Sequence, residues 1–150
     1  MVRVKDIMTK DVITVTEDTT IKELAKILTD NRISGCPVVD KDGSVLGVVG
    51  EGDLVMLQKN LHIPTVVAIF DAVIYLESLK HFEEDLNKMT GSIVGDIYNK
   101  KFVAVTPDSL ISEAATIMDE KKLGTIPVIE NKKLVGVVGK VDIVRSIINA

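Results

Sequence analysis

The sequence contains two copies of one segment, and this repeat limits the folds open to the chain more than any other feature. After Asp42 the spacing between the copies falls from 90 to 89 positions, because the second copy has a turn one residue shorter. Repeats of this kind share a continuous core, since one copy alone cannot bury its apolar face. Matching segments include 6–7 with 96–97, 15–18 with 105–108, 36–39 with 126–129, 47–50 with 136–139, and Asp53 with Asp142.

Each copy predicts the order strand, helix, strand, strand, helix. In the first copy we expect strands at 12–15, 37–39 and 45–49, with a turn at 40–43 and a second helix from 53 to 57. In the second copy we expect the first strand at 102–105. The expected fold class is α/β (α+β), with two pseudo-symmetric modules packed sheet to sheet. Apolar residues at helical spacing are Ile21, Leu24, Ala25 and Leu28 in one copy, and Ile111, Ala114, Ala115 and Met118 in the other.

The two copies differ at the start of this first helix. Thr20 and Glu23 fit a capping box in the first copy. The position equivalent to Thr20 is Leu110, so the pattern predicts that Ser109 or Asp108 caps the second helix.

Composition and charge argue against several classes of protein. The net charge is −4, and only 3% of residues are aromatic, so binding of DNA or RNA through phosphate neutralisation and base stacking is not expected. The N-terminus lacks the apolar run of a signal peptide, and the apolar stretch 63–76 is too short to span a bilayer. These features predict a cytoplasmic protein without a membrane segment.

Residues 58–95 separate the two copies, and we expect a helical linker or arm there between a first module at 1–57 and a second at 96–150. Pro64 can start a helix, and Gly91 can end it. Its apolar stripe is wide, which favours an arm that packs on a second subunit in a homodimer. The alternative is that the arm folds back on its own two modules.

Several ordered motifs resemble the CBS-domain family, named for cystathionine beta-synthase. They are Met8-Thr9 before the first strand, the Val-x-Thr-x-Asp segment, residues 34–39, and the Leu-Gly-Val-Val-Gly-x-x-Asp-Leu run. The resemblance implies a stand-alone tandem pair, or Bateman module, with two clefts between the copies. In many members a cleft binds AMP, ADP, ATP or S-adenosylmethionine, and the pairs often dimerise.

The resemblance places the ribose-binding carboxylate on Asp53 and Asp142. A carboxylate can accept hydrogen bonds from both hydroxyls of a ribose. The alternative is that each aspartate only caps a helix and offsets its dipole. Both roles can coexist.

The resemblance also implies loops that face the adenine and an opposite wall for each cleft. The alternatives are an ordinary helix-to-strand connection for the loops and strand residues without a ligand for the walls. The loops are Ser34, Gly35, Cys36 and Pro37, and Gly124, Thr125, Ile126 and Pro127; the walls are Thr14 with Thr16, and Ala104 with Thr106.

One departure from the family pattern concerns the phosphate. Three residues before each aspartate the family usually has Ser or Thr, whereas this chain has Gly50 and Gly139. The next residues are Glu51 and Lys140, which would repel and attract phosphate if they point into their own clefts. On that premise the two clefts are unequal, and the Asp142 cleft is the better nucleotide site.

The remaining chemistry-bearing residues predict no further site. Cys36 lies among apolar residues and is expected to be a packing cysteine, and His62 and His81 lack the spacing of a metal site. We therefore expect a regulatory module that requires no cofactor, senses an adenosine-containing metabolite and signals to an effector protein in trans. The alternative is a structural dimerisation module with empty clefts; an enzyme is not expected.

Overall fold

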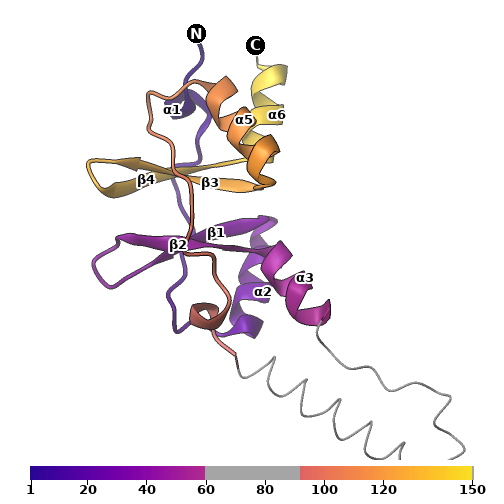
Figure 1. Cartoon of the computed structure of the whole chain (residues 1–150). Helices are drawn as coiled ribbons and strands as arrows, with labels where there is room; N and C mark the ends of the chain where they lie inside the picture. Colours follow the sequence, from indigo (N-terminus) through magenta and orange to yellow (C-terminus); the bar gives the residue numbers. More distant parts are fainter. Residues whose placement is uncertain (60–91, 150) are drawn as a thin grey trace, which may run out of the picture.

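The computed structural model describes residues 1–59 and 92–149, which form two similar α/β modules stacked on each other (Figure 1). The first module contains helix α2 (Ile21–Asn31), strands β1 (Gly35–Val39) and β2 (Val45–Gly50), and helix α3 (Glu51–Lys59). The second contains α5 (Ile111–Lys121), β3 (Thr125–Glu130), β4 (Lys133–Gly139) and α6 (Lys140–Ile148). Two short helices, α1 (Val4–Ile7) and the 3-10 helix η2 (Val94–Asp96), precede the modules.

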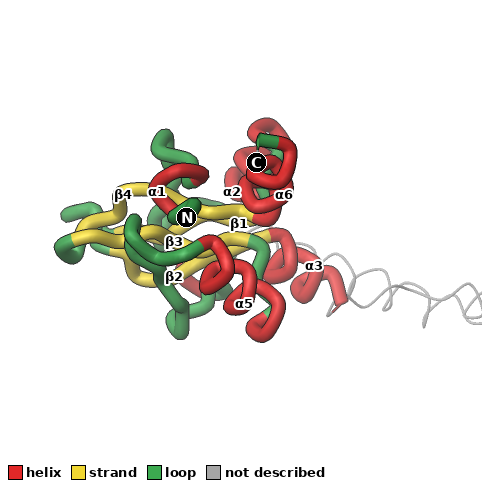
Figure 2. The backbone as a smooth tube through the Cα atoms, turned by 90° about the horizontal axis from the view of Figure 1, so that it is seen from above, coloured by secondary structure: helices red, strands yellow, loops and turns green. Residues whose placement is uncertain are grey.

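The two hairpins lie back to back, and helices α2, α3, α5 and α6 gather at one end of the strands (Figure 2). β1 pairs with β2, and β3 with β4, both antiparallel. β1 and β3 meet where the modules touch, which confirms the predicted packing of sheet on sheet. The predicted fold class is therefore confirmed.

The predicted first strand of each module is reduced to one residue of pairing. Val15 forms a parallel bridge with Val38, and Val105 forms the same bridge with Val128. Before this bridge the Val12 N–H donates to the Lys10 carbonyl at 3.0 Å, and after it the Thr16 N–H donates to the Thr19 hydroxyl at 3.1 Å, so neither bonds to a neighbouring strand. The strands predicted at 12–15 and 102–105 are corrected accordingly.

The helix starts differ as the sequence predicted, but the capping residue of α5 was predicted wrongly. Thr20 caps α2, and the Glu23 carboxylate accepts from the Thr20 backbone N–H at 3.0 Å. The N-cap of α5 is Leu110, which offers no side-chain oxygen. Ser109 is instead the repeat equivalent of Thr19, and its hydroxyl accepts from the Thr106 N–H at 3.1 Å. Neither Ser109 nor Asp108 caps α5.

The short segment at the start of each repeat packs on the module that the other repeat forms. Val4 of α1 is fully buried in the core of the second module. Val94 of η2 is fully buried in the core of the first module. Asn99 pairs with β2, and Thr9 pairs with β4 in the equivalent place. The core of each module therefore includes a residue that the predicted boundaries place in a different segment. Those boundaries, which divide the chain into 1–57, 58–95 and 96–150, remain a prediction.

Some predictions concern residues that the structure does not describe. The helical arm, with Pro64 and Gly91, and both histidines, His62 and His81, lie outside the described residues. Within residues 1–59 and 92–149, no helix is long and apolar enough to cross a membrane.

Candidate ligand cleft between the modules

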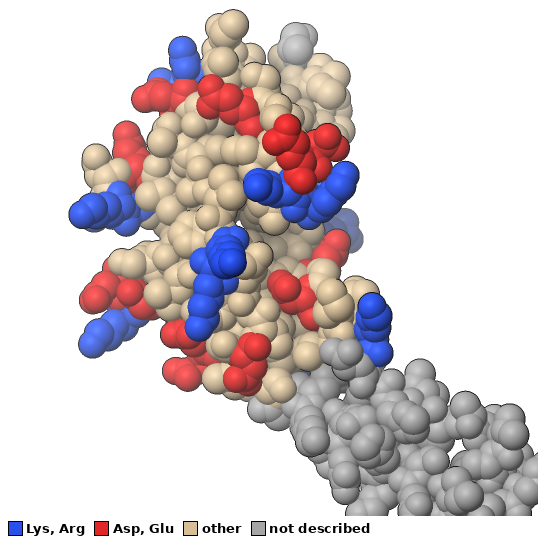
Figure 3. Space-filling view, viewed as in Figure 1, with Lys and Arg blue, Asp and Glu red and all other residues tan. Residues whose placement is uncertain are grey.

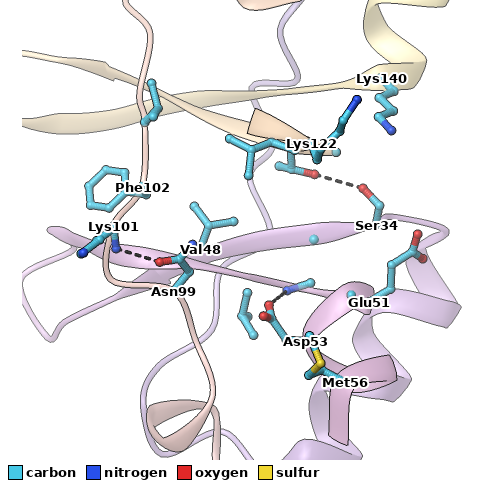
Figure 4. Close-up of a pocket in the computed structure, with 18 residues that line it drawn as sticks. Ser34, Val48, Glu51, Asp53, Met56, Asn99, Lys101, Phe102, Lys122 and Lys140 are labelled. Atoms are coloured by element: carbon cyan, nitrogen blue, oxygen red, sulfur yellow. Dashed lines mark hydrogen bonds between the residues drawn. The ribbon is translucent and has the colours of Figure 1, made fainter. Parts of the chain in front are cut away.

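A cavity of about 550 Å³ opens between the two modules beside Asp53 (Figure 4). Its floor comes from β2 and the start of α3, its roof from the α5–β3 connection, and one side from residues 99–103. This volume lies in the range of small-molecule sites. Seven of the residues predicted from the family resemblance line it: Ser34, Gly35, Gly50, Asp53, Gly124, Thr125 and Lys140.

The Asp53 carboxylate lies in the wall of this cavity at the third residue of α3. Its Oδ2 accepts from the Gly50 backbone N–H at 2.9 Å, so it caps the helix from inside the first turn, not as the N-cap residue itself. Oδ1 has no hydrogen-bond partner among residues 1–59 and 92–149. Burial raises the pKa of Asp53, and the hydrogen bond from Gly50 lowers it in part. This half-buried carboxylate has room to accept from a ligand.

The Asp142 carboxylate is in a different state, although it occupies the equivalent helix position. Only 4% of this residue is exposed. Its oxygens accept from the Gly139 backbone N–H at 2.7 Å and from the Thr9 hydroxyl at 3.3 Å. Arg145 lies 3.4 Å away and forms an ion pair with it. Asp142 does not line the cavity beside Asp53, and its carboxylate is already satisfied by protein groups.

The predicted ranking of the two clefts rested on the condition that Glu51 and Lys140 point into their own clefts. Lys140 lines the cavity beside Asp53, together with Glu51, so Lys140 does not distinguish the Asp142 cleft. In Figure 4 the Lys140 side chain hangs from the upper module and Glu51 rises from the lower one. The inequality of the clefts remains a hypothesis, and the geometry now favours the Asp53 cleft.

Part of the cavity lining lies where the two modules contact each other, a contact that we call the seam. The Ser34 and Thr125 hydroxyls lie 3.2 Å apart across the seam. A Cβ atom added to Gly50 would lie 2.6 Å from the Ser34 carbonyl oxygen, which is too close without a backbone shift. A Cβ at Gly139 would meet nothing nearer than 3.7 Å. The family's Ser or Thr therefore does not fit at position 50 in this backbone, whereas space for it exists at position 139.

The other predicted contact residues do not line this cavity. Cys36, Pro37, Ile126 and Pro127 are buried in the strands. Cys36 is buried in the core of the first module, which confirms the prediction of a packing cysteine, and burial raises the pKa of its thiol to about 11. The four predicted wall residues, Thr14, Thr16, Ala104 and Thr106, are exposed at the surface.

The cavity also contains residues that sequence reasoning missed. Asn99 and Phe102 come from the segment that enters the second repeat but packs on the first module. Lys101 belongs to the same segment, Lys122 follows α5, and Met56 lies on α3. No local motif marks them. Their only sequence signal is the repeat register, which pairs Asn99 with Thr9 and Lys101 with Asp11.

Within the part of the chain that the structure describes, no group of three or more His, Cys, Asp or Glu side chains could hold a metal ion. The hydrogen-bonding groups of the cavity are hydroxyls, an amide, carboxylates and ammonium groups from both modules. Such a set suits a polar organic ligand with hydroxyl and charged groups.

The structure is a tandem pair of α/β modules. A repeat relates the two modules, and a cleft with a carboxylate in its wall lies between them. The family model described as "CBS domain" matches residues 4–60 and 94–149. The chain therefore belongs to the CBS-domain family, with two tandem domains.

Several curated proteins are similar to this chain. An uncharacterized protein of Methanocaldococcus jannaschii is 29% identical over 97% of this chain and 90% of its own length. The chloroplastic CBS domain-containing protein CBSX1 of Arabidopsis thaliana is 30% identical over 95% of this chain, which spans 63% of that protein. A homoserine O-acetyltransferase of Methanosalsum zhilinae is 30% identical over 99% of this chain, which spans only 24% of that enzyme.

Solved structures share the fold. The structure of CBSX2 in complex with AMP has a TM-score of 0.73 and 23% identity, and the match covers 99% of this chain and 98% of that one. The CBS domain pair of protein MJ0100, in complex with 5′-methylthioadenosine and S-adenosyl-L-methionine, has a TM-score of 0.75 and 21% identity, with the same coverage. At this identity the likeness establishes the fold alone.

Proposed function

We propose that this chain is a regulatory module that binds an adenosine-containing metabolite in the cleft beside Asp53 and signals its occupancy to a partner protein. The observation that carries this proposal is the Asp53 carboxylate, which is half-buried in the wall of a ligand-sized cavity and has one oxygen without a partner among the described residues. The complexes of CBSX2 with AMP, and of the MJ0100 pair with two adenosine compounds, support the ligand class. No catalytic step is part of the proposal.

The chemistry at Asp53 suits a sugar. Burial removes water from the carboxylate and raises its pKa, and among the described residues only the Gly50 N–H donates to it, at Oδ2. Two ribose hydroxyls would supply donors in a charge-assisted pair. Binding would therefore favour the ionised carboxylate.

The signal would arise from the position of the cleft. Its lining comes from both modules, with Asp53 in one and Thr125 in the other. A ligand that contacts both modules favours one relative orientation over others, by the difference in its affinity for each. A partner that contacts both modules could read that orientation.

The exposed surface of α3 and α6 favours association with a second copy of the chain, as a homodimer. Six large apolar side chains on α3 and α6 are at least 58% exposed with respect to the described residues, which is typical of an interaction face. Because the repeat relates α3 to α6, a second copy rotated about a twofold axis would meet similar faces. The six are Val55, Met56, Val141, Val144, Ile147 and Ile148.

Sedimentation of the wild type and of Ile147→Glu tests this dimer. We expect a dimer for the wild type and a weaker dimer for the variant, because a buried carboxylate without a partner opposes association. A wild-type monomer at high concentration would contradict the dimer. It would leave the ligand proposal standing.

Calorimetric titration with AMP tests the binding function. We expect the wild type to bind and Asp53→Asn to lose at least tenfold in affinity, since an amide cannot offer two charged acceptor oxygens. Asp30→Asn, which changes an exposed aspartate at the end of α2, is the matched control and should bind as the wild type does. The alternative, a structural module with empty clefts, is supported if neither AMP nor S-adenosylmethionine gives a heat of binding.

A further inference from the structure

The cavity beside Asp53 carries a surplus of positive charge in an acidic protein. Three lysines line it, each from a different place: Lys101 before α5, Lys122 after α5 and Lys140 at the start of α6. Two acidic residues, Glu51 and Asp53, also line it. The lining is therefore net positive by one charge, whereas the whole chain is net negative by four.

These ammonium groups are available to a ligand. Within residues 1–59 and 92–149, Lys101 and Lys140 form no ion pair. Lys122 lies 4.0 Å from Asp119, and both side chains are more than 80% exposed, so this pair is weak. Figure 3 shows Lys and Arg side chains on both rims of the hollow between the modules.

The positive charge is not a general property of the repeat. The repeat equivalents of Lys101, Lys122 and Lys140 are Asp11, Arg32 and Glu51. Two of the three positions thus carry the opposite charge in the first copy. The lysines gather at one cleft because residues 99–103 and the start of α6 both face the cavity beside Asp53.

We infer that the ligand of the Asp53 cleft is a nucleoside with a phosphorylated 5′ position, selected over uncharged or cationic adenosine compounds. This inference rests on the proposed function, because Asp53 must hold the ribose. Lys122 and Lys140 in the roof of the cleft can form charge-assisted contacts with a phosphate group, and Lys101 adds positive charge on the opposite side of the cleft (Figure 4). A sulfonium nucleoside such as S-adenosylmethionine would instead place a positive charge among these three ammonium groups.

Calorimetric titration with adenosine, AMP, ADP and S-adenosylmethionine at two salt concentrations tests the inference. We expect affinity to rise with each phosphate, and ADP to bind at least tenfold more tightly than adenosine or S-adenosylmethionine. Higher salt should weaken ADP binding and leave adenosine binding nearly unchanged, because salt screens the contacts to exposed lysines.

Variants of single lysines test whether the preference for phosphorylated ligands comes from the cavity. Lys101→Met and Lys140→Met should each weaken ADP binding about tenfold, without weakening that of adenosine. Lys100→Met and Lys121→Met are the matched controls, since both lysines are exposed neighbours that do not line the cavity. All four changes are at exposed positions, and circular dichroism will verify that each variant folds.

The outcomes separate this inference from the proposed function. If adenosine or S-adenosylmethionine binds as tightly as ADP, or the Lys101 and Lys140 variants bind ADP as the controls do, charge selection is overturned and the adenosine site stands. If no adenosine compound binds, the proposed function fails and this inference fails with it.

Discussion

Asp53 and Asp142 occupy the same place in two copies of one module, yet their surroundings make them different groups. Both accept a hydrogen bond from the backbone N–H three residues earlier. Asp142 is in addition bound by Thr9 and paired with Arg145, whereas Asp53 faces a cavity. The repeat equivalents of Thr9 and Arg145 are Asn99 and Met56, and neither forms a hydrogen bond or ion pair with Asp53. The comparison shows that one motif can hold a structure together in one copy and leave a carboxylate free for a ligand in the other.

Replacing each aspartate by alanine gives the largest expected contrast. Asp142→Ala removes a buried carboxylate and leaves the Gly139 N–H and the Thr9 hydroxyl without their acceptor at a partly buried place, and should cost about 2 kcal/mol of unfolding free energy. Asp53→Ala removes one hydrogen bond at a half-buried site and should cost about 1 kcal/mol or less. Chemical denaturation measures both. Equal losses would remove the distinction between the two carboxylates.

The glycines before these aspartates give the next contrast. Gly50→Ser forces a backbone shift against the Ser34 carbonyl and should cost about 1–3 kcal/mol. Gly139→Ser has room, and its hydroxyl can cap α6, so it should be neutral or stabilising by a few tenths, about 0.3 kcal/mol. Thermal denaturation of the two variants provides the measurement, and a stable Gly50→Ser protein would contradict the tight seam.

The first helices of the two modules offer a smaller contrast. Glu23→Ala breaks the capping box of α2 and should cost about 0.5–1 kcal/mol. Glu113→Ala, at the equivalent position of α5, has no box to break and loses only the interaction of an acidic side chain with the helix N-terminus, so it should cost less, about 0.3 kcal/mol. The two unfolding free energies are measured side by side. A larger loss for Glu113→Ala would show that the caps do not explain the difference.

The dependence of stability on pH should show the smallest effect. Since burial raises the pKa of Asp53, the folded protein binds this proton more tightly than the unfolded chain does. The resulting stability is present at acid pH, below the ordinary pKa of aspartate, and is lost as the pH rises through the folded pKa. Asp53→Asn does not titrate there, so its stability relative to the wild type should increase over that range. A relative stability that does not change with pH would contradict the raised pKa.

Local patterns in the sequence predicted most of the secondary structure. The β-branched runs and the turn at Asp40–Gly43 specified the hairpin of β1 and β2, and Gly43 adopts the positive φ of 83° that such a turn requires. The shorter turn of the second hairpin places Asn131 and Lys132 at positive φ. These features depend on neighbours in the chain, and so they can be read from one sequence.

Features that depend on distant parts of the chain could not be predicted in this way. Nothing near Val4 indicates that it packs against the second module, because its pattern fits burial in either core. In the same way, the segment that enters the second repeat packs on the first module and brings Lys101 to the Asp53 cavity. The place of Lys140 could not be read from the sequence for a related reason, since α6 begins where the modules meet and Lys140 lines the cavity beside Asp53.

The number of ligands bound by each chain tests the central claim most directly, namely that the two equivalent carboxylates differ in their availability to a ligand. Native mass spectrometry over a series of AMP concentrations should show one AMP per wild-type chain at saturation, and Asp53→Asn should need at least tenfold more AMP to reach the same occupancy. Two AMP molecules per chain with equal affinity, or an Asp53→Asn chain that fills at the same AMP concentration as the wild type, would contradict the account.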